Sequence, residues 1–156
     1  MADWKLPRAE NQSDQRVIDD VRHHGWHIIH VGADADGPGW SFSIGLYYTF
    51  GVPEFMIFGL PISSNEVIIN GLGVEIRAGQ RFSHGTVDAN VLERQNVQFV
   101  TIARTHYRAY LGYAIWFYNG MDFPTLQIVW PDKHGRFPWD ARCAFDDSVQ
   151  PVLGAL

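Results

Sequence analysis

The sequence predicts an α+β fold: a mostly antiparallel mixed sheet with about three helices packed on it, in a single domain. Two observations lead to this prediction. Segments with the apolar patterns of strands occur in clusters, and segments with the apolar spacing of helices separate these clusters. The 156 residues are 46% hydrophobic and 19% charged, as in globular domains with one core. We expect residues 13–156 to form this domain and residues 1–12 to be a flexible N-terminal segment.

The first predicted elements are a helix and a short strand. The helix begins at Ser13 and ends at Gly25, a typical stop residue. Three apolar residues share one face of this helix: Val17, Ile18 and Val21. Residues 26–31 are predicted to form the strand that follows.

The next two strands differ in pattern. Residues 40–46 alternate between large apolar and small residues, which predicts a strand with one apolar face and one face that carries Ser41 and Ser43. Residues 55–60 are apolar almost without interruption, which is typical of a central strand buried on both faces. Residues 47–55 join these strands, either as part of a functional site or as a plain hairpin connection whose aromatic residues cover the end of the sheet.

The second half of the chain adds two helices and three strands. The segment from Ser63 to Glu66 fits a capping box that opens a helix, and Gly79 can close that helix. Thr105 can cap a further helix with a broad apolar stripe that ends at Asn119. The remaining strands are predicted at residues 86–92, 97–104 and 125–130.

Composition restricts the partners of the protein. The formal net charge is -5, and the 12 Lys and Arg residues are scattered, so we expect no nucleic-acid partner. The N-terminus has no signal-peptide core and no apolar run approaches the length of a membrane span, so we expect no membrane association. Cys143 is a single cysteine, which excludes an intramolecular disulfide and favours the cytoplasm. The sequence leaves open whether the protein forms a homo-oligomer.

Four of the seven histidines lie close together in the sequence, at His23, His24, His27 and His30. His27 and His30 are three residues apart on a predicted strand, so their side chains point to opposite faces. No zinc-binding spacing such as H-E-x-x-H is present. We therefore expect no metal site, and no motif identifies a cofactor. The alternative is that three histidines converge in space, with Asp34 or Asp132 as a further ligand.

The most distinctive segment is Leu126–Asp140, which combines two Trp, two Pro and two Asp after a strand-like apolar run. Asp132 can accept hydrogen bonds from its own following backbone and Gly135 can adopt a positive φ, which together predict a tight turn. The two Trp side chains need both burial and partners for their N–H groups. Asp132 and Asp140 are either paired catalytic carboxylates or turn and cap residues.

The candidate functional residues come from separate segments that carry aromatic or polar side chains near predicted strand ends. The small serine side chains leave space above the sheet, and aromatic residues could cover that space. The alternative is that the serine face is open to solvent. The candidates for acid–base chemistry are His24, Glu54 and Asp132, and those for substrate contact are Trp26, Ser41, Ser43, Tyr48, Trp130 and Trp139.

The chain resembles a bacterial family of domains of unknown function, number 4262 in that series, from about residue 24 to residue 154. Members often have Tyr and Thr where this chain has Phe42 and Ser43, and His where it has Val52. If that Tyr hydroxyl and that His served chemistry in relatives, this chain lacks them. The family implies no activity, because none is established for it. The segments that carry the resemblance are His24–Trp26, Trp40–Leu46, Pro53–Phe55 with Gly59–Leu60, Leu126–Asp132 with Gly135–Trp139, and Gln150–Gly154.

Two classes of function follow from these observations. The first is a domain that binds or transforms a small molecule in an aromatic-lined pocket, with a flavin as one variant by fold-level analogy alone. The second is a non-catalytic interaction, regulatory or immunity-like module, which fits the acidic charge, the small size and the absence of a known catalytic motif. Whether the protein is an enzyme stays open at this point.

Overall fold

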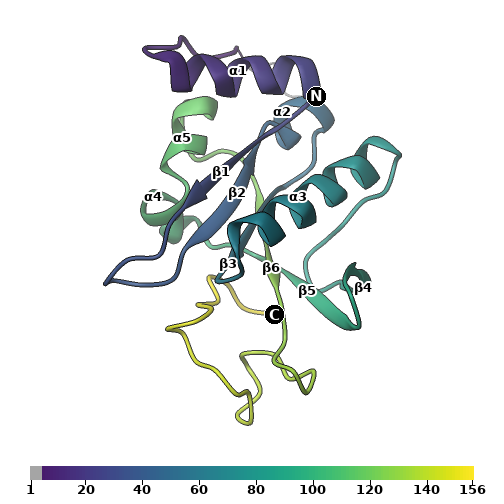
Figure 1. Cartoon of the computed structure of the whole chain (residues 1–156). Helices are drawn as coiled ribbons and strands as arrows, with labels where there is room; N and C mark the ends of the chain where they lie inside the picture. The colour runs from purple at the N-terminus through teal and green to yellow at the C-terminus, as the bar shows by residue number, and fades with distance from the viewer. Residues whose placement is uncertain (1–4) are drawn as a thin grey trace.

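A six-stranded mixed sheet forms the centre of the protein, with its strands in the order β1-β2-β3-β6-β5-β4 (Figure 1). The computed structural model describes residues 5–156, so part of the N-terminal segment predicted to be flexible lies outside the described residues. β3 and β6 are parallel, and the other neighbouring strands pair antiparallel. The strands are β1 (His27–Val31), β2 (Trp40–Ile44), β3 (Glu54–Phe58), β4 (Val87–Leu92), β5 (Gln95–Thr101) and β6 (Thr125–Val129).

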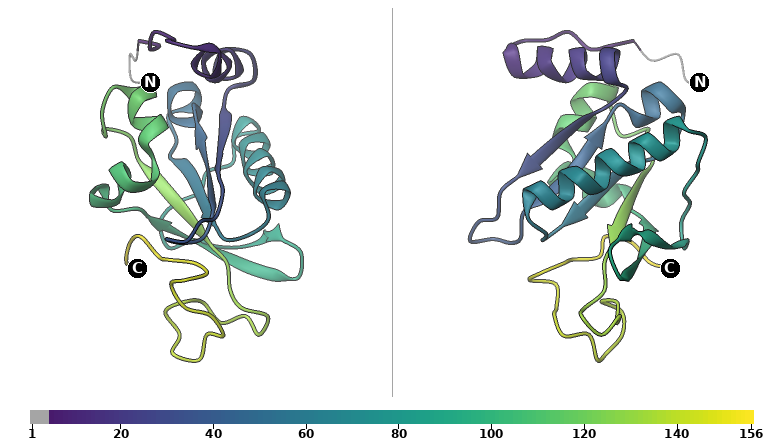
Figure 2. Two further views of the ribbon diagram at one scale, coloured as in Figure 1. Left: turned by 60° about the vertical axis from the view of Figure 1, so that its left-hand side comes forward. Right: turned by 45° about the vertical axis from the view of Figure 1, so that its right-hand side comes forward.

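Helices cover both faces of the sheet. Figure 2 shows α3 on one face, α4 and α5 on the other, and α1 across one end of the sheet. The α+β fold with a mostly antiparallel mixed sheet is therefore confirmed. The helices are α1 (Gln12–His24), α2 (Leu46–Phe50), α3 (Ile62–Arg77), α4 (Tyr107–Tyr110) and α5 (Gly112–Tyr118), and a 3-10 turn, η1 (Arg104–His106), precedes α4.

Two apolar cores lie on the two faces, because side chains of successive strand residues point in opposite directions. The core under α1, α4 and α5 contains Phe42 and Ile44 of β2, as the alternating pattern predicted. The core under α3 contains Phe55 and Ile57 of β3. Each of these fully buried side chains contributes roughly 1.5–3 kcal/mol to folding relative to an exposed one.

The serine face of β2 is not open to solvent. Ser41 and Ser43 are both fully buried. Helix α3 packs against β2 on this side, and Asn65 of α3 donates a hydrogen bond to the Ser41 hydroxyl. Helix α3 thus covers Ser41 on this face, where aromatic residues were the predicted cover.

Three local predictions also need correction. Residues 46–50 form helix α2 where a plain connection was one expectation. Helix α3 begins at Ile62 after Pro61, so Ser63 lies inside the helix and is not its N-cap. The helix predicted from Thr105 is interrupted at Leu111, whose φ of -122° is outside the helical region. By contrast, α1 ends as predicted, with Gly25 as its C-cap.

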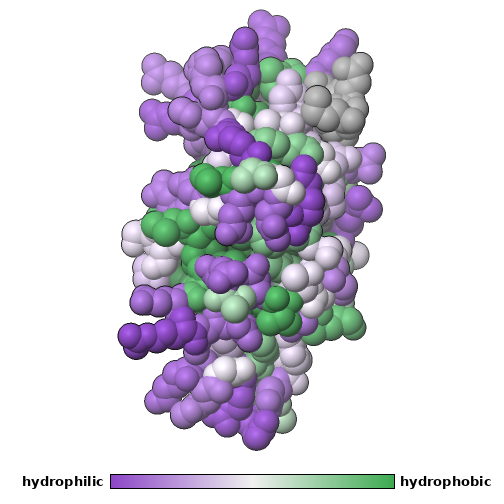
Figure 3. Space-filling model, turned by 90° about the vertical axis from the view of Figure 1, so that its right-hand side faces the viewer, coloured by the Kyte–Doolittle hydropathy of each residue, from purple (hydrophilic) through white to green (hydrophobic). Residues whose placement is uncertain are grey.

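The surface is polar at both ends of the molecule. Figure 3 shows hydrophobic side chains gathered at mid-height on the face turned to the viewer, between strongly hydrophilic ends. Val67 and Val74 are exposed on α3 at 72% and 59%, seven residues apart and so on one side of the helix.

Candidate functional site

The predicted site residues do not meet in one place. Ser43 and Glu54 lie in the interior, and Ser41 lies beside them under α3. His24 and Trp26 line a pocket between α1, β1 and α3. Trp130 and Asp132 line a groove at the opposite end of the sheet. Trp139 lines a smaller pocket beside the C-terminal segment, and Tyr48 packs its ring edge-on against Phe117 of α5.

Glu54 begins β3 and is almost completely buried, at 1% exposure. Its Oε1 atom accepts hydrogen bonds from the Ser43 hydroxyl at 2.7 Å and from the backbone N–H of Leu46 at 3.2 Å. Its Oε2 atom accepts from the backbone N–H groups of Gly45 and Tyr47 at 3.0 and 3.2 Å, and from the Tyr118 hydroxyl. The carboxylate thus joins β2, the start of α2 and the end of α5.

The hydroxyl groups around Glu54 have assignable proton positions. The Ser43 oxygen accepts the backbone N–H of Phe55 at 2.9 Å, and the Tyr118 oxygen accepts the backbone N–H of Tyr48 at 3.1 Å. Since a hydroxyl has one hydrogen, each of these groups can direct it at Glu54. All five groups around the carboxylate are donors, so Glu54 serves as a common acceptor in the interior.

The burial of Glu54 has electrostatic consequences. Burial raises the pKa of Glu54 above its ordinary value, and the hydrogen bonds from Tyr118, Ser43, Tyr47 and Gly45 oppose this rise. Burial and the nearby Glu54 carboxylate also raise the pKa of the Tyr118 hydroxyl. Each oxygen of Glu54 already has at least two donors, which leaves no position for a substrate proton.

A second buried polar chain involves Ser41. Its hydroxyl oxygen lies 2.6 Å from Nδ1 of His30 and 3.1 Å from Nδ2 of Asn65. The Asn65 amide also donates to the Leu60 carbonyl oxygen at 3.3 Å, which can only accept and so fixes the orientation of the amide. Ser41 thus ties the edge strand β1 to helix α3.

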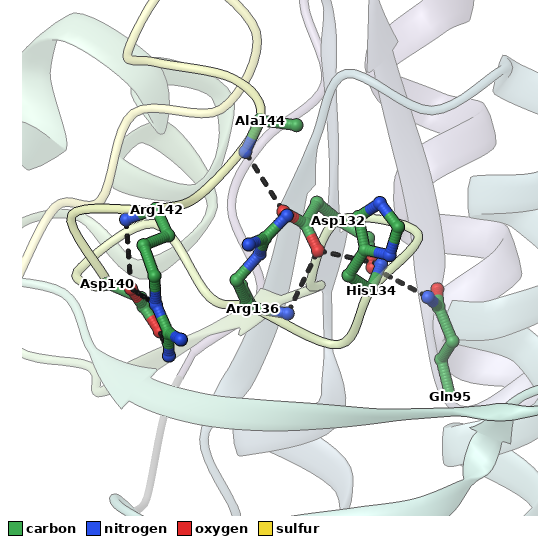
Figure 4. A network of polar contacts seen from close by, with 7 residues as sticks. All are labelled: Gln95, Asp132, His134, Arg136, Asp140, Arg142 and Ala144. Carbon is green, nitrogen blue, oxygen red and sulfur yellow. Dashed lines mark hydrogen bonds and ion pairs between the residues drawn. The ribbon is translucent and has the colours of Figure 1, made fainter.

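The turn predicted around Asp132 is present (Figure 4). The Asp132 Oδ1 atom accepts the backbone N–H groups of His134 and Arg136 at 2.8 and 3.0 Å. Its Oδ2 atom accepts the backbone N–H of Ala144 at 2.9 Å and Nε of Arg136 at 3.2 Å. Gly135 has a φ of +79° and donates its N–H to the Asp132 carbonyl oxygen. Asp132 therefore connects the turn to the segment near residue 144.

The acidity of Asp132 follows from these contacts. Burial acts to raise its pKa, but the hydrogen bonds from Arg136, Ala144 and His134 outweigh burial, and the pKa lies well below its usual range. Asp140, the other carboxylate of this segment, pairs with exposed Arg142 at 3.1 Å. The two aspartates have separate partners and do not form a catalytic pair with each other.

A groove with a volume of about 1130 Å³, which we call the Trp130 groove, lies at one end of the sheet. It lies where the parallel strands β3 and β6 end, because Leu60 follows β3 and Trp130 follows β6. The turn of the β4–β5 hairpin forms the opposite wall. Its apolar lining is Leu60, Leu92, Trp130, Pro131, Phe137 and Phe145, and its polar lining includes Glu93, Arg94, Gln95, Asn96, Asp132, Lys133 and His134.

The floor and walls of the Trp130 groove are held by direct contacts. The Trp130 ring lies 4.8 Å from the Phe145 ring, and its Nε1–H donates to the Phe58 carbonyl oxygen at 2.8 Å. Gln95 on β5 donates to the Asp132 carbonyl oxygen at 2.7 Å, which joins the hairpin to the turn. The apolar ring of Trp130 is therefore positioned by the sheet itself.

Two buried glutamines, which sequence reasoning missed, hold the C-terminal segment against β6. Gln127 donates to the Pro151 carbonyl oxygen at 2.7 Å and accepts the Leu153 N–H at 2.9 Å. Gln150 accepts the Trp130 N–H at 3.0 Å and donates to the Trp130 carbonyl oxygen at 2.8 Å. Each side-chain amide pairs with backbone as a neighbouring strand would. The signal for Gln127 was a polar residue inside an apolar strand, where an amide needs a partner.

Two kinds of feature are absent from residues 5–156. Among these residues, no three His, Cys, Asp or Glu side chains come together closely enough to hold a metal ion. The same residues include no helix with the length and apolar character needed to cross a bilayer.

The sequence comparisons give one match. Residues 20–144 match the family model described as "Domain of unknown function (DUF4262)". No curated protein and no solved structure matches the chain. Because the match covers most of the sequence, the chain belongs to the DUF4262 family, as the resemblance in its sequence segments predicted.

Proposed function

We propose that this member of the DUF4262 family binds a small molecule with a flat apolar body and an anionic group in the Trp130 groove. The observation that carries this proposal is the pairing of an aromatic floor, Trp130 against Phe145, with basic side chains in the same groove. Ligand pockets typically combine an apolar lining with a few placed polar groups. The volume of about 1130 Å³ is sufficient for a ligand of drug size.

Charge supports an anionic ligand. The whole chain has a formal net charge of -5, yet the groove contains Arg94 and Lys133 against one carboxylate other than Asp132, that of Glu93. The negative charge of Asp132 is already taken up by Arg136 and three backbone N–H groups. A groove that is locally basic in an acidic protein favours an anion over a cation.

The backbone at Arg94 adds a second line of support. Arg94 has a φ of +68° at the tip of the β4–β5 hairpin, where Leu92 pairs with Gln95. A residue other than glycine in this region costs on the order of 1 kcal/mol. Such strain is more common at ligand-binding positions, and here it brings a guanidinium to the groove.

In this function the groove binds a ligand without a chemical step. Asp132 has a structural role, and Trp130 contacts the ligand. Asp132 shapes the wall of the groove, and Trp130 supplies the surface on which a flat ligand stacks. Of the nine predicted site residues, the proposal retains these two at the groove. Glu54 keeps a role in the interior, since its oxygens already accept five hydrogen bonds.

Isothermal titration calorimetry with a matched pair of probes tests this function. We expect 2-naphthoate to bind and its uncharged analogue 2-naphthamide to bind about tenfold more weakly, because only the carboxylate pairs with Arg94 and Lys133. Arg94→Gln and Lys133→Gln should each weaken the binding of 2-naphthoate. Arg108→Gln, at an exposed position on α4, should leave this binding unchanged. Equal affinity for the two probes, or no response to either groove variant, would contradict the proposal.

A second candidate, a non-catalytic interaction module, is favoured by the exposed Val67 and Val74 on α3. Exposed apolar groups on one helix face are typical of surfaces that contact another protein. The two candidates separate in one measurement. The double variant Val67→Ser, Val74→Ser should bind 2-naphthoate as the parent protein does. If the interaction module is the function, the same variant should no longer bind a protein partner that the parent binds.

We also propose the bacterial cytoplasm as the setting of this protein. Support comes from Cys143, which is the one cysteine in the chain and has no second cysteine with which to form an intramolecular disulfide. Fractionation of cells that express the gene from its own promoter would test this proposal.

A further inference from the structure

We infer a second ligand site in the pocket between α1, β1 and α3, and we propose that it binds a free α-amino acid. This pocket has a volume of about 510 Å³ and lies far from the Trp130 groove in the fold, since β1 is at one edge of the sheet. It contains groups of both charge signs together with a fixed amide and a fixed imidazole. The residues on which the inference rests are Asp20, Trp26, His27, Glu66, Asn70 and Arg77.

The imidazole of His27 is fixed by Asp20. His27 Nδ1 lies 2.7 Å from Asp20 Oδ2, and the two side chains are 17% and 37% exposed. Because a carboxylate can only accept, Nδ1 of His27 carries the hydrogen in this contact. His27 pairs in register with Ile44, so its side chain lies on the α1 side of β1, where the Asp20–His27 pair forms one edge of the pocket.

The guanidinium of Arg77 is fixed by two aromatic rings and a carbonyl group. Its central carbon lies 4.9 Å from the centre of the Trp26 ring and 5.8 Å from that of Phe50. It also donates a hydrogen bond to the His24 carbonyl oxygen. A guanidinium has five N–H donors, and most of those of Arg77 have no acceptor among residues 5–156, so they can bind a carboxylate.

The amide of Asn70 is fixed by Trp26. The indole Nε1–H, which can only donate, lies 2.9 Å from Asn70 Oδ1. The Asn70 NH₂ group is thereby left as a donor, and it has no acceptor among residues 5–156. The indole reaches this position because Gly73 of α3 has no side chain, since a Cβ there would lie 2.5 Å from the Trp26 ring. Asn70 and Arg77 thus present donors to a carboxylate from one helix.

Glu66 completes the arrangement with a negative charge. It lies one helical turn before Asn70, on the same side of α3, and lines the same pocket. A ligand with one carboxylate and one ammonium can pair with Arg77 and Glu66 at once, whereas a simple anion or cation would face a like charge. Ile28 and Val74 provide an apolar wall for the ligand side chain. These features together point to a zwitterion of amino-acid size.

Thermal shift measurements with free amino acids and their blocked forms test the inference. We expect at least one of the twenty common amino acids, at millimolar concentration, to raise the melting temperature by about 2 °C or more. The N-acetyl form of that amino acid lacks the ammonium and its methyl ester lacks the carboxylate, so neither should raise it. The inference is overturned if none of the twenty has an effect, or if a blocked form acts as well as the free one.

Variants of pocket residues and matched controls show whether the rise in melting temperature comes from binding in this pocket. Arg77→Gln and Glu66→Gln should each remove the shift, whereas Arg22→Gln on α1 and Glu75→Gln on α3 make the same chemical changes at exposed positions outside the pocket and should keep it. Chemical-shift changes at the Asn70 side-chain amide provide a second readout that does not depend on stability. A shift retained in both pocket variants would overturn the inference.

Discussion

Glu54 and Asp132 are both carboxylates that accept hydrogen bonds from converging donors, but they lie in regions of different kinds. Glu54 is in the interior and joins β2, α2 and α5, with a donor from Tyr118, 64 residues away. Asp132 is in a loop after β6, and the most distant partner of its side-chain carboxylate is Ala144, 12 residues away. The first carboxylate connects elements of the whole domain, and the second organises one loop.

The difference teaches where function can arise in this protein. A buried carboxylate whose two oxygens both accept hydrogen bonds can stabilise the fold without taking part in a reaction. Glu54 does not line the Trp130 groove, whereas Asp132 shapes one of its walls. Changes at Glu54 should therefore act on the stability of the whole fold, and changes at Asp132 on the groove.

The largest effect is expected from Glu54→Ala. The change removes the acceptor of five hydrogen bonds, four of them buried, so the free energy of unfolding should fall by about 3 kcal/mol or more. Urea unfolding followed by circular dichroism measures this fall. Glu75→Ala, at an exposed position on α3, is the matched control and should behave like the parent protein. A Glu54→Ala protein as stable as this control would show that the interior network contributes little.

A smaller and more local effect is expected from Asp132→Ala. The melting temperature should fall by roughly 3–8 °C, because backbone N–H groups of His134, Arg136 and Ala144 lose their acceptor. Amide hydrogen exchange should become faster at residues 132–144 and stay unchanged in α2. Unchanged exchange in the loop, or faster exchange throughout the domain, would remove the proposed difference between the two regions.

The pH dependence of stability should have opposite signs at the two carboxylates. The pKa of Asp132 is lowered by folding, so its contribution is present above its ordinary pKa and is lost as the pH falls. The pKa of Glu54 is raised by folding, so its contribution is present below its ordinary pKa and is lost as the pH rises through the raised value. Melting temperatures of Asp132→Asn, Glu54→Gln and the parent protein from acid to neutral pH test these signs.

Relative to the parent protein, the deficit of Asp132→Asn should shrink toward acid pH, and that of Glu54→Gln should shrink toward neutral pH. Parallel curves for the two variants would contradict the opposite shifts.

The smallest effect is expected from Trp139→Ala. Trp139 is 45% exposed and stacks on Phe137 with ring centres 5.0 Å apart, whereas Trp130 donates to Phe58 and forms the floor of the groove. The melting temperature of Trp139→Ala should stay within about 2 °C of the parent value. Trp130→Ala is the comparison and should lower it further and abolish 2-naphthoate binding. Equal losses in the two variants would mean that both tryptophans hold the loop.

Much of the fold could be predicted because its signals are local. The alternation in residues 40–46 and the apolar run in residues 55–60 correspond to β2 and β3. Helix α2 could not be predicted in this way, because its first N–H groups bond to Glu54, which follows later in the chain. The capping box failed because Pro61, which has no N–H group and a fixed φ, sets the start of α3 one residue before Ser63.

The candidate site also has features that local sequence predicts and features that depend on distant parts of the chain. The Asp132 turn could be predicted because Asp132 bonds to residues two and four positions later, within the motif. The separation of Trp26 from Trp130 could not, because it depends on strand order: β1 is an edge strand, and β6 lies inside the sheet beside β3. Apolar patterns identify the strands but do not encode which strands are neighbours.

The central claim is that the Trp130 groove binds ligands and that the Glu54 network supports the fold. Two-dimensional ¹H–¹⁵N NMR spectra recorded during titration with 2-naphthoate test this most directly. We expect the backbone amides that shift to belong to residues 92–96, 130, 132–137 and 144–145, with no shifts at residues 45–47. Shifts centred on residues 45–47 and Glu54 and absent from the groove would contradict it.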